Sequence, residues 1–179
     1  ALHGRPTREV VVDPFSPADV AELTGMDPAA TLDAYLIVGG YPTLAAGWAR
    51  GWSRGRFLGE ALEDSHTQFV VNGERILETE LPYNPQARDV LEALGAGERT
   101  FSTLRDASGV FSAASLTNAL KLLIAEKRIV AEASPCSVPA PQKSKRYSIA
   151  DPHLRFWLTF VGPGIDEIDR GRADLVIDR

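Results

Sequence analysis

The stretch that decides the fold is Ser112-Ala-Ala-Ser-Leu-Thr-Asn-Ala-Leu-Lys-Leu-Leu-Ile-Ala-Glu126. Ser112 suits the N-cap of a helix, because its hydroxyl can accept a hydrogen bond from a free backbone N–H. Apolar residues then recur at positions i, i+3, i+4 and i+7, which places them on one face of an α-helix. These residues are Leu116, Ala119, Leu120 and Leu123.

Shorter elements flank this helix in the order of a winged helix-turn-helix. A helical pattern over residues 101–107 ends at Ser108-Gly109, where glycine permits the positive φ of a tight turn. Strand-like segments follow at residues 128–134 and 145–149, with a polar, proline-rich stretch between them. Residues 86–94 supply a third helix. The sequence therefore predicts a mainly α fold with a small β-wing.

The first half of the chain is predicted to be helical. Ser16-Pro17 and Asp27-Pro28 are helix starts, and the second of these helices should stop at Gly39-Gly40. Further helices are expected over residues 43–49, 56–69 and 75–81, and a lone strand over residues 9–12. The apolar stripe expected for the second helix consists of Leu32, Tyr35 and Leu36.

Proline-rich boundaries divide the chain into three parts. Pro82-Tyr-Asn-Pro85 separates a helical subdomain, residues 1–82, from the winged helix, residues 83–150. Asp151-Pro152 then begins a strongly apolar helix, which Gly162-Pro163-Gly164 is expected to break. Residues 151–179 are interpreted as this helix and the start of a further domain.

Composition bounds the class of protein. The 179 residues are 44% hydrophobic, enough to form a core, and no apolar run reaches the roughly 18 residues of a membrane span. Cys136 is the only cysteine, so neither an internal disulfide nor a cysteine-rich metal site is expected. There is no signal segment at the start. We therefore expect a cytoplasmic location and no membrane partner.

Charge is unevenly distributed along the chain. The formal net charge is −5, but residues 85–150 carry nine Lys and Arg against six Asp and Glu. The winged helix is thus the mildly basic part of an acidic chain, which favours an anionic partner for it.

No catalytic constellation is present in the sequence. His3, His66 and His153 are far apart and have no companions at metal-ligand spacing, so structural or surface roles are expected for them and no metal site is expected. The chain also has no Gly-x-x-x-x-Gly-Lys-Ser/Thr phosphate loop. This chain alone is not expected to be an enzyme.

The face of residues 112–126 opposite the leucines is compatible with either DNA or a protein as its partner. Asn118 could read an adenine and Lys121 could meet a phosphate, whereas Leu122 and Ala125 suit a packed protein neighbour better. The wing adds a small basic cluster. The predicted DNA-facing residues are Ser115, Asn118, Lys121, Lys143, Lys145 and Arg146.

Several short motifs together resemble the archaeal-type ATPases of the STAND class, which are relatives of AAA+ proteins. The resemblance rests on Gly39-Gly-Tyr-Pro42 after a capped helix, on the winged helix, and on Asp151-Pro-x-Leu-Arg-Phe-Trp157. Leu2-His-Gly-Arg5 with the following residues 9–15 is similar to the segment after the sensor strand of that family. Each motif is short, and their order and spacing carry the resemblance over nearly the whole chain.

The resemblance implies a function that composition does not show. Members of this family carry an ATPase core, a helical lid, a winged helix and a nuclease-like C-terminal domain. Residues 1–82 would then be lid-like, residues 9–12 would be the last strand of the core sheet, and Arg5 would sense phosphate. The turn that would contact the adenine consists of Gly39, Gly40, Tyr41 and Pro42.

The sequence also departs from the family pattern. The phosphate loop, the Mg-binding acid and the sensor are missing, so ATP with Mg²⁺ is expected to bind in a full-length protein and not tightly to this chain alone. The expected partners are the missing ATPase core and C-terminal domain, and DNA or a protein.

Two alternatives remain open from the residues. One is a stand-alone winged-helix transcription regulator that binds DNA. The other is an assembly module that associates through Leu122, Trp157 and Phe160.

Overall fold

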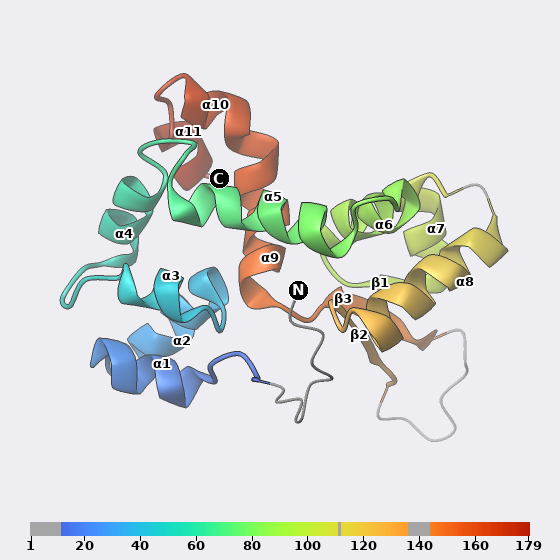
Figure 1. The fold of residues 1–179 in the computed structure, drawn as a ribbon, viewed down its shortest axis with the longest axis horizontal. Coiled ribbons are helices and arrows are strands. Elements are labelled where there is room, and N and C mark those ends of the chain that lie inside the picture. Colours follow the sequence, from blue (N-terminus) through green and yellow to red (C-terminus); the bar gives the residue numbers. More distant parts are fainter. Residues whose placement is uncertain (1–11, 111, 136–143) are drawn as a thin grey trace, which may run out of the picture.

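The computed structural model describes residues 12–110, 112–135 and 144–179. The chain is mainly helical with a small antiparallel sheet, as the sequence predicts. Helices α1 to α5 form one half and α6 to β3 form the other, and a C-terminal helical segment lies between the two halves (Figure 1).

The helical half consists of α1 (Pro17–Thr24), α2 (Pro28–Val38), α3 (Pro42–Ala46), α4 (Arg54–Ala61) and α5 (Gln68–Glu80). The predicted caps are confirmed. Ser16 accepts a hydrogen bond from the backbone of Asp19 in a capping box, and Asp27 accepts from Ala29 and Ala30. Gly25 ends α1 in the left-handed conformation.

The predicted bounds of two helices in this half are wrong. The helix expected over residues 56–69 is α4 and ends at Ala61, and the helix expected over residues 75–81 is α5 and already begins at Gln68, because Thr67 caps it. The expected strand at residues 9–12 lies outside the described residues except for Val12, and it stays a prediction.

The stripe predicted for α2 is wrong at two of its three residues, while Tyr35 is partly buried against the core. Leu32 and Leu36 are 55% and 61% exposed, because α2 packs on α1 and on the C-terminal segment through its other side. The residues that α2 buries are Thr31, Ala34, Ile37 and Val38.

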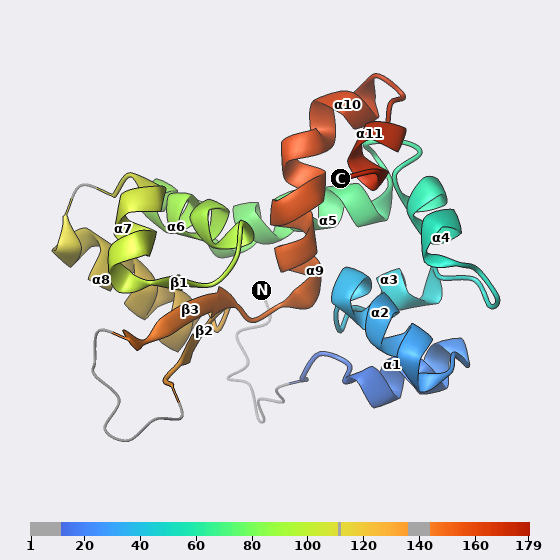
Figure 2. The same ribbon diagram turned by 180° about the vertical axis from the view of Figure 1, so that it is seen from behind.

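The winged-helix half follows the predicted order. It consists of α6 (Pro85–Gly95), β1 (Arg99–Thr100), α7 (Phe101–Ser108), α8 (Ala113–Lys121), the π-helical turn η1 (Leu122–Glu126), β2 (Val130–Ala133) and β3 (Arg146–Ile149). The four residues predicted for the buried face of α8 and η1 are buried. The short strand β1 was not predicted from the sequence. The sheet has the order β1-β3-β2, and it lies alongside α8 (Figure 2).

The C-terminal segment connects the two halves. It consists of α9 (Pro152–Phe156), η3 (Trp157–Val161), η4 (Gly162–Gly164), α10 (Ile165–Asp169) and α11 (Asp174–Ile177), and it contacts α2, α5 and α6. The predicted break at residues 162–164 is wrong, because the backbone stays helical there. Pro163 lies at the start of η4, where a missing N–H costs no hydrogen bond. The division of the chain into three domains stays a prediction.

Among the described glycines, the one with the closest neighbour joins α5 to this segment. A Cβ atom built on Gly73 would lie 2.2 Å from the indole ring of Trp157, so no side chain fits at position 73. The indole Nε1 donates a hydrogen bond of 2.6 Å to the carbonyl of Val70. Trp157 is 4% exposed, so it is not available for the assembly contact that the sequence suggested.

Among the described residues, no single helix has the length and apolar character to cross a membrane, although α7 together with α8 and η1 would pass as a bent pair.

Gly73→Ala should destabilise the protein by about 3 kcal/mol, because the added methyl group must displace the Trp157 ring from a packed core. The free energy of unfolding from urea denaturation measures this effect. Gly59→Ala is the matched control. Gly59 is an exposed helical glycine in α4 with open space around it, so alanine should stabilise by about 0.5–1 kcal/mol there. Equal effects of the two substitutions would contradict the packing argument.

Candidate functional site: a cavity between the two halves

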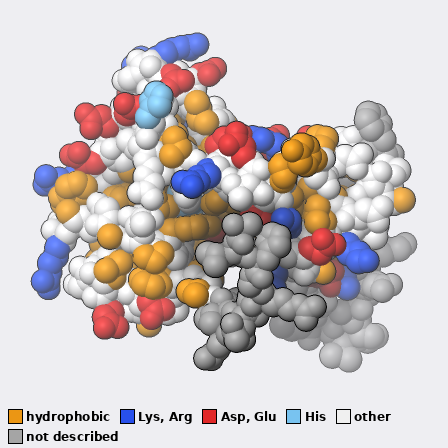
Figure 3. Space-filling model, viewed as in Figure 1, with side chains coloured by type: hydrophobic (Ala, Val, Ile, Leu, Met, Phe, Trp, Pro, Cys, Tyr) orange, Lys and Arg blue, Asp and Glu red, His pale blue; other side chains and the backbone are white. Residues whose placement is uncertain are grey.

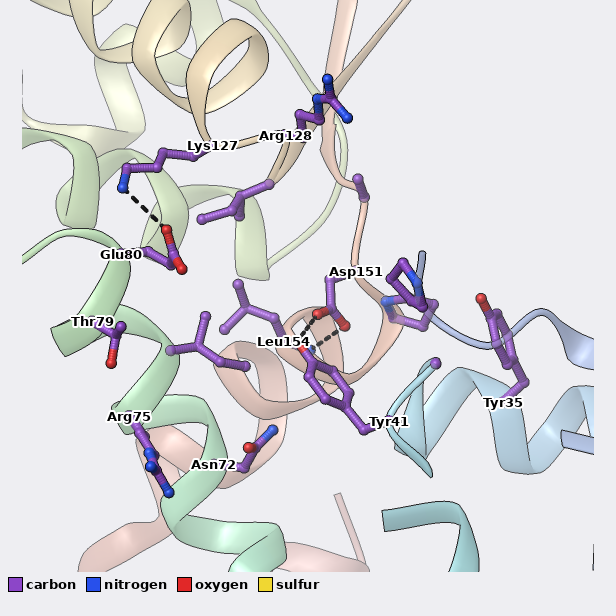
Figure 4. A pocket seen from close by; sticks show the side chains of 16 residues that line it. Tyr35, Tyr41, Asn72, Arg75, Thr79, Glu80, Lys127, Arg128, Asp151 and Leu154 are labelled. Carbon is purple, nitrogen blue, oxygen red and sulfur yellow. Dashed lines mark hydrogen bonds and ion pairs between the residues drawn. The ribbon is translucent and has the colours of Figure 1, made fainter. Parts of the chain in front are cut away.

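A cavity of about 510 Å³ lies where the helical half, the winged helix and the C-terminal segment meet (Figure 4). Its walls come from the turn after α2, one side of α5, the residues after η1, and the start of α9. The lining is largely apolar. The residues that line it are Pro14, Tyr35, Gly40, Tyr41, Asn72, Arg75, Ile76, Thr79, Glu80, Lys127, Arg128, Ile129, Ala150, Asp151, Pro152 and Leu154.

The two glycines of the turn after α2 allow close approach of other segments. Gly39 has a φ of 60°, and a Cβ atom there would lie 3.1 Å from His153. At Gly40, a Cβ atom would lie 2.6 Å from the carbonyl oxygen of Phe15. The Phe15 N–H donates to the Gly40 carbonyl at 3.0 Å. The turn is therefore clamped between the segment before α1 and the start of α9.

Tyr41 connects this turn to the C-terminal segment. Its hydroxyl donates a hydrogen bond to Oδ2 of Asp151, while Oδ1 of the same carboxylate accepts from the backbone N–H of Leu154 at 3.1 Å. Burial, and then the charge of Asp151, raise the pKa of Tyr41. The tyrosine therefore remains a hydrogen-bond donor, and one carboxylate holds both the turn and the N-terminus of α9.

The structure brings only part of the predicted nucleotide-contact set to the cavity. Gly40 and Tyr41 line it, whereas Gly39 is buried against α9 and Pro42 is exposed at the start of α3. Arg5 lies outside the described residues. The role of these residues in binding a nucleotide stays a prediction.

The charged groups of the cavity are mostly paired or peripheral. Lys127 and Glu80 form an ion pair of 3.1 Å that joins the winged helix to α5. Arg75 and Arg128 are exposed, form no ion pair within the described part of the chain, and lie at opposite ends of the cavity (Figure 4). Asp151 is the other carboxylate of the cavity wall, and among the described residues it accepts hydrogen bonds but forms no ion pair.

The backbone of Arg128 adopts a conformation that usually requires glycine. Its φ is 56°, and it is the only residue with a side chain that has a positive φ among those described. The N–H of Ile129 donates to the carbonyl of Leu123 at 2.9 Å, which closes the end of η1 as in a Schellman motif.

His153 is a buried histidine beside this site, and the sequence did not distinguish it from His3 and His66. It is 0% exposed, and its Nδ1 lies 3.0 Å from the carbonyl of Ile37. Nδ1 must therefore carry the proton, because a carbonyl only accepts. Nε2 is buried without a partner, and burial lowers the pKa of the ring.

Asn72 was also not singled out from the sequence. It lies on the side of α5 that lines the cavity, and its amide nitrogen Nδ2 is buried without a hydrogen-bond partner. Only the three-dimensional structure shows this, because asparagine in a helix usually faces solvent.

Only some of the predicted DNA-facing residues are exposed and without an interaction partner among the described residues. Asn118 and Lys121 are exposed on α8, and Arg146 is exposed on β3. Ser115 is half-buried and accepts from the Ser112 hydroxyl at 3.0 Å. Lys145 forms an ion pair of 2.5 Å with Glu132, and Lys143 lies outside the described residues.

On the face drawn in Figure 3, Lys and Arg side chains lie scattered among Asp and Glu side chains. Within the described residues there is no group of three or more His, Cys, Asp or Glu side chains that could hold a metal ion.

Comparison with known proteins identifies no relative, since no family model, no curated protein and no solved structure matches the chain.

Protonation of His153 should reduce stability in acid. Its folded-state pKa lies below the unfolded value of about 6.5, so between these two values the unfolded chain binds the extra proton. The free energy of unfolding should therefore be flat above pH 6.5 and fall below it, with a slope approaching ~1.4 kcal/mol per pH unit. Urea denaturation at several pH values between about 5 and 8 measures this.

His66 needs a control because it titrates in the same window with the opposite sign. Its exposed ring contacts Asp64, which raises its pKa, so its stabilising effect is complete below 6.5 and lost as pH rises through its folded value. The series should therefore be measured in a His66→Ala background. Adding His153→Leu should then abolish the slope, and a slope that persists would show that another group is responsible.

Proposed function

We propose that this chain is the lid and winged-helix portion of an ATP-binding STAND/AAA-like ATPase. In that protein it would couple the state of the bound nucleotide to a DNA or protein partner. The turn Gly39–Pro42 would meet the adenine, and the winged helix would move with the partner. We place this function in the cytoplasm.

One observation carries the proposal. The turn that the family resemblance assigns to the adenine forms part of the wall of the cavity described above, and that cavity lies between the helical half and the winged helix. Tyr41 of this turn is bonded to Asp151, which begins the segment that contacts both halves. A ligand that touched both this turn and the winged-helix residues Arg128 and Ile129 of the same cavity would therefore act on the connection between the two halves.

The residues present fit the base of a nucleotide better than its phosphates. The cavity is large enough for a purine, and its lining includes Tyr41, Ile76 and Leu154. The sequence has no phosphate loop, so the groups that hold the triphosphate and Mg²⁺ would come from the ATPase core. Hydrolysis by this chain alone is not part of the proposal.

The mass of the native protein tests the proposal. The protein should be isolated from its own cells with an antibody against this chain and analysed as an intact species and as peptides. A mass well above 19.4 kDa, with peptides that carry a phosphate loop before Ala1, is the expected result. A mass near 19.4 kDa would contradict the proposal and would indicate a small winged-helix protein.

Salt dependence tests whether DNA is the partner. Each phosphate contact adds about 0.9 to the steepness of log affinity against log salt. Arg146 is exposed and has no ion pair within the described part of the chain, so Arg146→Ala should reduce this slope by about 0.9. Lys145→Ala should reduce it less, because Glu132 already neutralises Lys145. Replacing Lys143, Lys145 and Arg146 together should flatten the slope most.

The matched control for the salt experiment is Arg155→Ala. Arg155 is also exposed and forms no ion pair with another described residue, but it lies on α9 outside the winged helix. Fluorescence anisotropy with a duplex of arbitrary sequence at several salt concentrations provides the measurement. If Arg155→Ala lowers the slope as much as Arg146→Ala does, the wing is not the contact surface. Absence of any binding would favour a protein partner.

A further inference from the structure

Helix α2 carries apolar residues around most of its circumference, but the described chain covers only part of it. Ala34, Ile37 and Val38 are buried, whereas Leu32 and Leu36 are 55% and 61% exposed. The two leucines are four residues apart and therefore lie on the same side of the helix. A helix that is apolar nearly all round is normally packed on every side. The exposed leucines of α2 therefore mark a surface on which a further partner fits.

A groove begins beside Leu36 and continues along the C-terminal segment. Two cavities, of about 480 and 460 Å³, share the lining residues Leu36, Phe156 and Phe160, so they adjoin and form one groove. The rings of Phe156 and Phe160 pack on each other with centroids 5.1 Å apart. Ile149 lines one cavity and Leu62 the other, so both are partly apolar. In Figure 2, the C-terminal segment runs between α6 on one side and α2 and α4 on the other.

The shape of the groove favours a helix as its occupant. β3 contributes Ile149 to the lining, but β3 is the central strand of the sheet. The described lining therefore offers no free strand edge to which an extended peptide could hydrogen-bond. A helix satisfies its own backbone hydrogen bonds and needs only side-chain contacts. A hollowed surface also fits the apolar face of one helix better than it fits a flat lipid surface.

The charges around the groove favour an acidic occupant. Two of its arginines, Arg54 and Arg155, form no ion pair with another described residue, and a third, Arg179, is paired with Glu167 at 2.8 Å. With Glu167 included, three positive charges lie around the groove against two negative ones, whereas the whole chain has a net charge of −5. Carboxylates of a partner would therefore gain attraction here, and ammonium groups would not. The charged lining residues are Asp33, Arg54, Arg155 and Arg179.

We propose that this groove binds an acidic amphipathic helix of another protein. Large apolar side chains one turn apart on that helix fill the two cavities on either side of Leu36, Phe156 and Phe160. Its carboxylates pair with Arg54 and Arg155. The groove contains no residue of the turn Gly39–Pro42, so the inference does not rest on the proposed function.

A peptide library tests the kind of partner. Random peptides of about 16 residues, roughly four helical turns, should be displayed on phage and selected on the immobilised intact chain. The expected result is enrichment of peptides that combine Asp and Glu with large apolar residues three or four positions apart. The most enriched peptide, synthesised with a fluorophore, then gives an affinity by fluorescence anisotropy.

Leu36→Glu tests the location of binding. It places a negative charge in the middle of the groove, so the affinity for the peptide should fall about tenfold or more. Leu36 is mostly exposed, so the chain should still fold, and the midpoint of urea denaturation checks this. Leu23→Glu is the matched control, because it makes the same change at a leucine of α1 that is 47% exposed and lines neither cavity. It should leave the affinity unchanged.

Arg54→Ala tests the charge of the groove. The affinity should fall about threefold, because one partner of the peptide carboxylates is lost. Arg50→Ala is the control, since Arg50 is exposed and lines neither cavity of the groove. Equal losses in these two variants would contradict the proposed ion pairs and overturn the acidic partner.

Other results would also overturn the inference. These are enrichment of basic or uncharged peptides, no enrichment at all, or equal losses in Leu36→Glu and Leu23→Glu. A dimer in sedimentation velocity that Leu36→Glu converts to a monomer would identify a second copy of this chain as the occupant. Cosedimentation with vesicles of phosphatidylcholine and phosphatidylserine that Leu36→Glu abolishes would identify a lipid surface instead.

Failure of this inference is distinct from failure of the proposed function. A native mass near 19.4 kDa with Leu36-dependent peptide binding would reject the ATPase and keep the groove as a docking site. If the native protein is longer, the peptide should bind it as well. A longer native protein that does not bind the peptide would overturn the inference, because its further residues would then cover the groove, and would leave the ATPase proposal intact.

Discussion

The contact between Gly73 and the ring of Trp157 is the constraint on which the rest of the structure depends. It lets the backbone of α5 lie directly on an indole, and the 2.6 Å hydrogen bond from that indole to Val70 fixes the rotation of α5 about its own axis. That rotation decides which side chains of α5 face the cavity. Phe69 turns towards His153, while Asn72 and Ile76 reach the cavity wall. The cavity is thus a consequence of one close packing contact.

A second set of interactions orients the turn after α2 against the same C-terminal segment. The carboxylate of Asp151 accepts from Tyr41 and from the first turn of α9, and His153 lies against Gly39 with its Nδ1 bonded to Ile37. These bonds are polar and partly or fully buried, so each depends on the exact position of its partner. The packing of Trp157 on α5 buries apolar surface, and the polar hydrogen bonds determine how the turn and α9 fit together.

Sequence reasoning succeeded where local patterns determine structure. The caps at Ser16 and Asp27 and the leucine face of α8 follow from bonding and spacing within one element. It failed where contacts between residues distant in sequence determine which side chains are buried and how the backbone runs. Leu36 looked like core because leucine is apolar, but the face of α2 that packs on α1 and α9 is the one that carries Ala34, Ile37 and Val38. The Gly162-Pro163-Gly164 stretch looked like a break, but Gly162 lets the helical path pass the ring of Trp157, where a Cβ atom would lie 2.8 Å away.

The residues of the candidate site also fall into two groups, those that local sequence motifs predict and those that depend on contacts between distant parts of the chain. The turn Gly39–Pro42 could be found from sequence because glycines and a proline form a visible motif, and two of its four residues do line the cavity. The buried amide of Asn72 could not be found from sequence, because only the three-dimensional structure shows that its Nδ2 atom has no hydrogen-bond partner among the described residues. Nor could the left-handed backbone of Arg128, because the sequence there carries no glycine to indicate a positive φ.

The position of the cavity limits how a ligand there could act. A ligand shifts the arrangement of two halves only by the difference between its affinities for the two arrangements. Tyr41 and Ile76 both belong to the helical half, so contacts with them alone would not distinguish one position of the winged helix from another. Ile129 and Arg128 belong to the winged helix and line the same cavity. Coupling therefore requires a ligand large enough to touch both walls, and the Lys127–Glu80 ion pair is the existing link that such a ligand would reinforce or break.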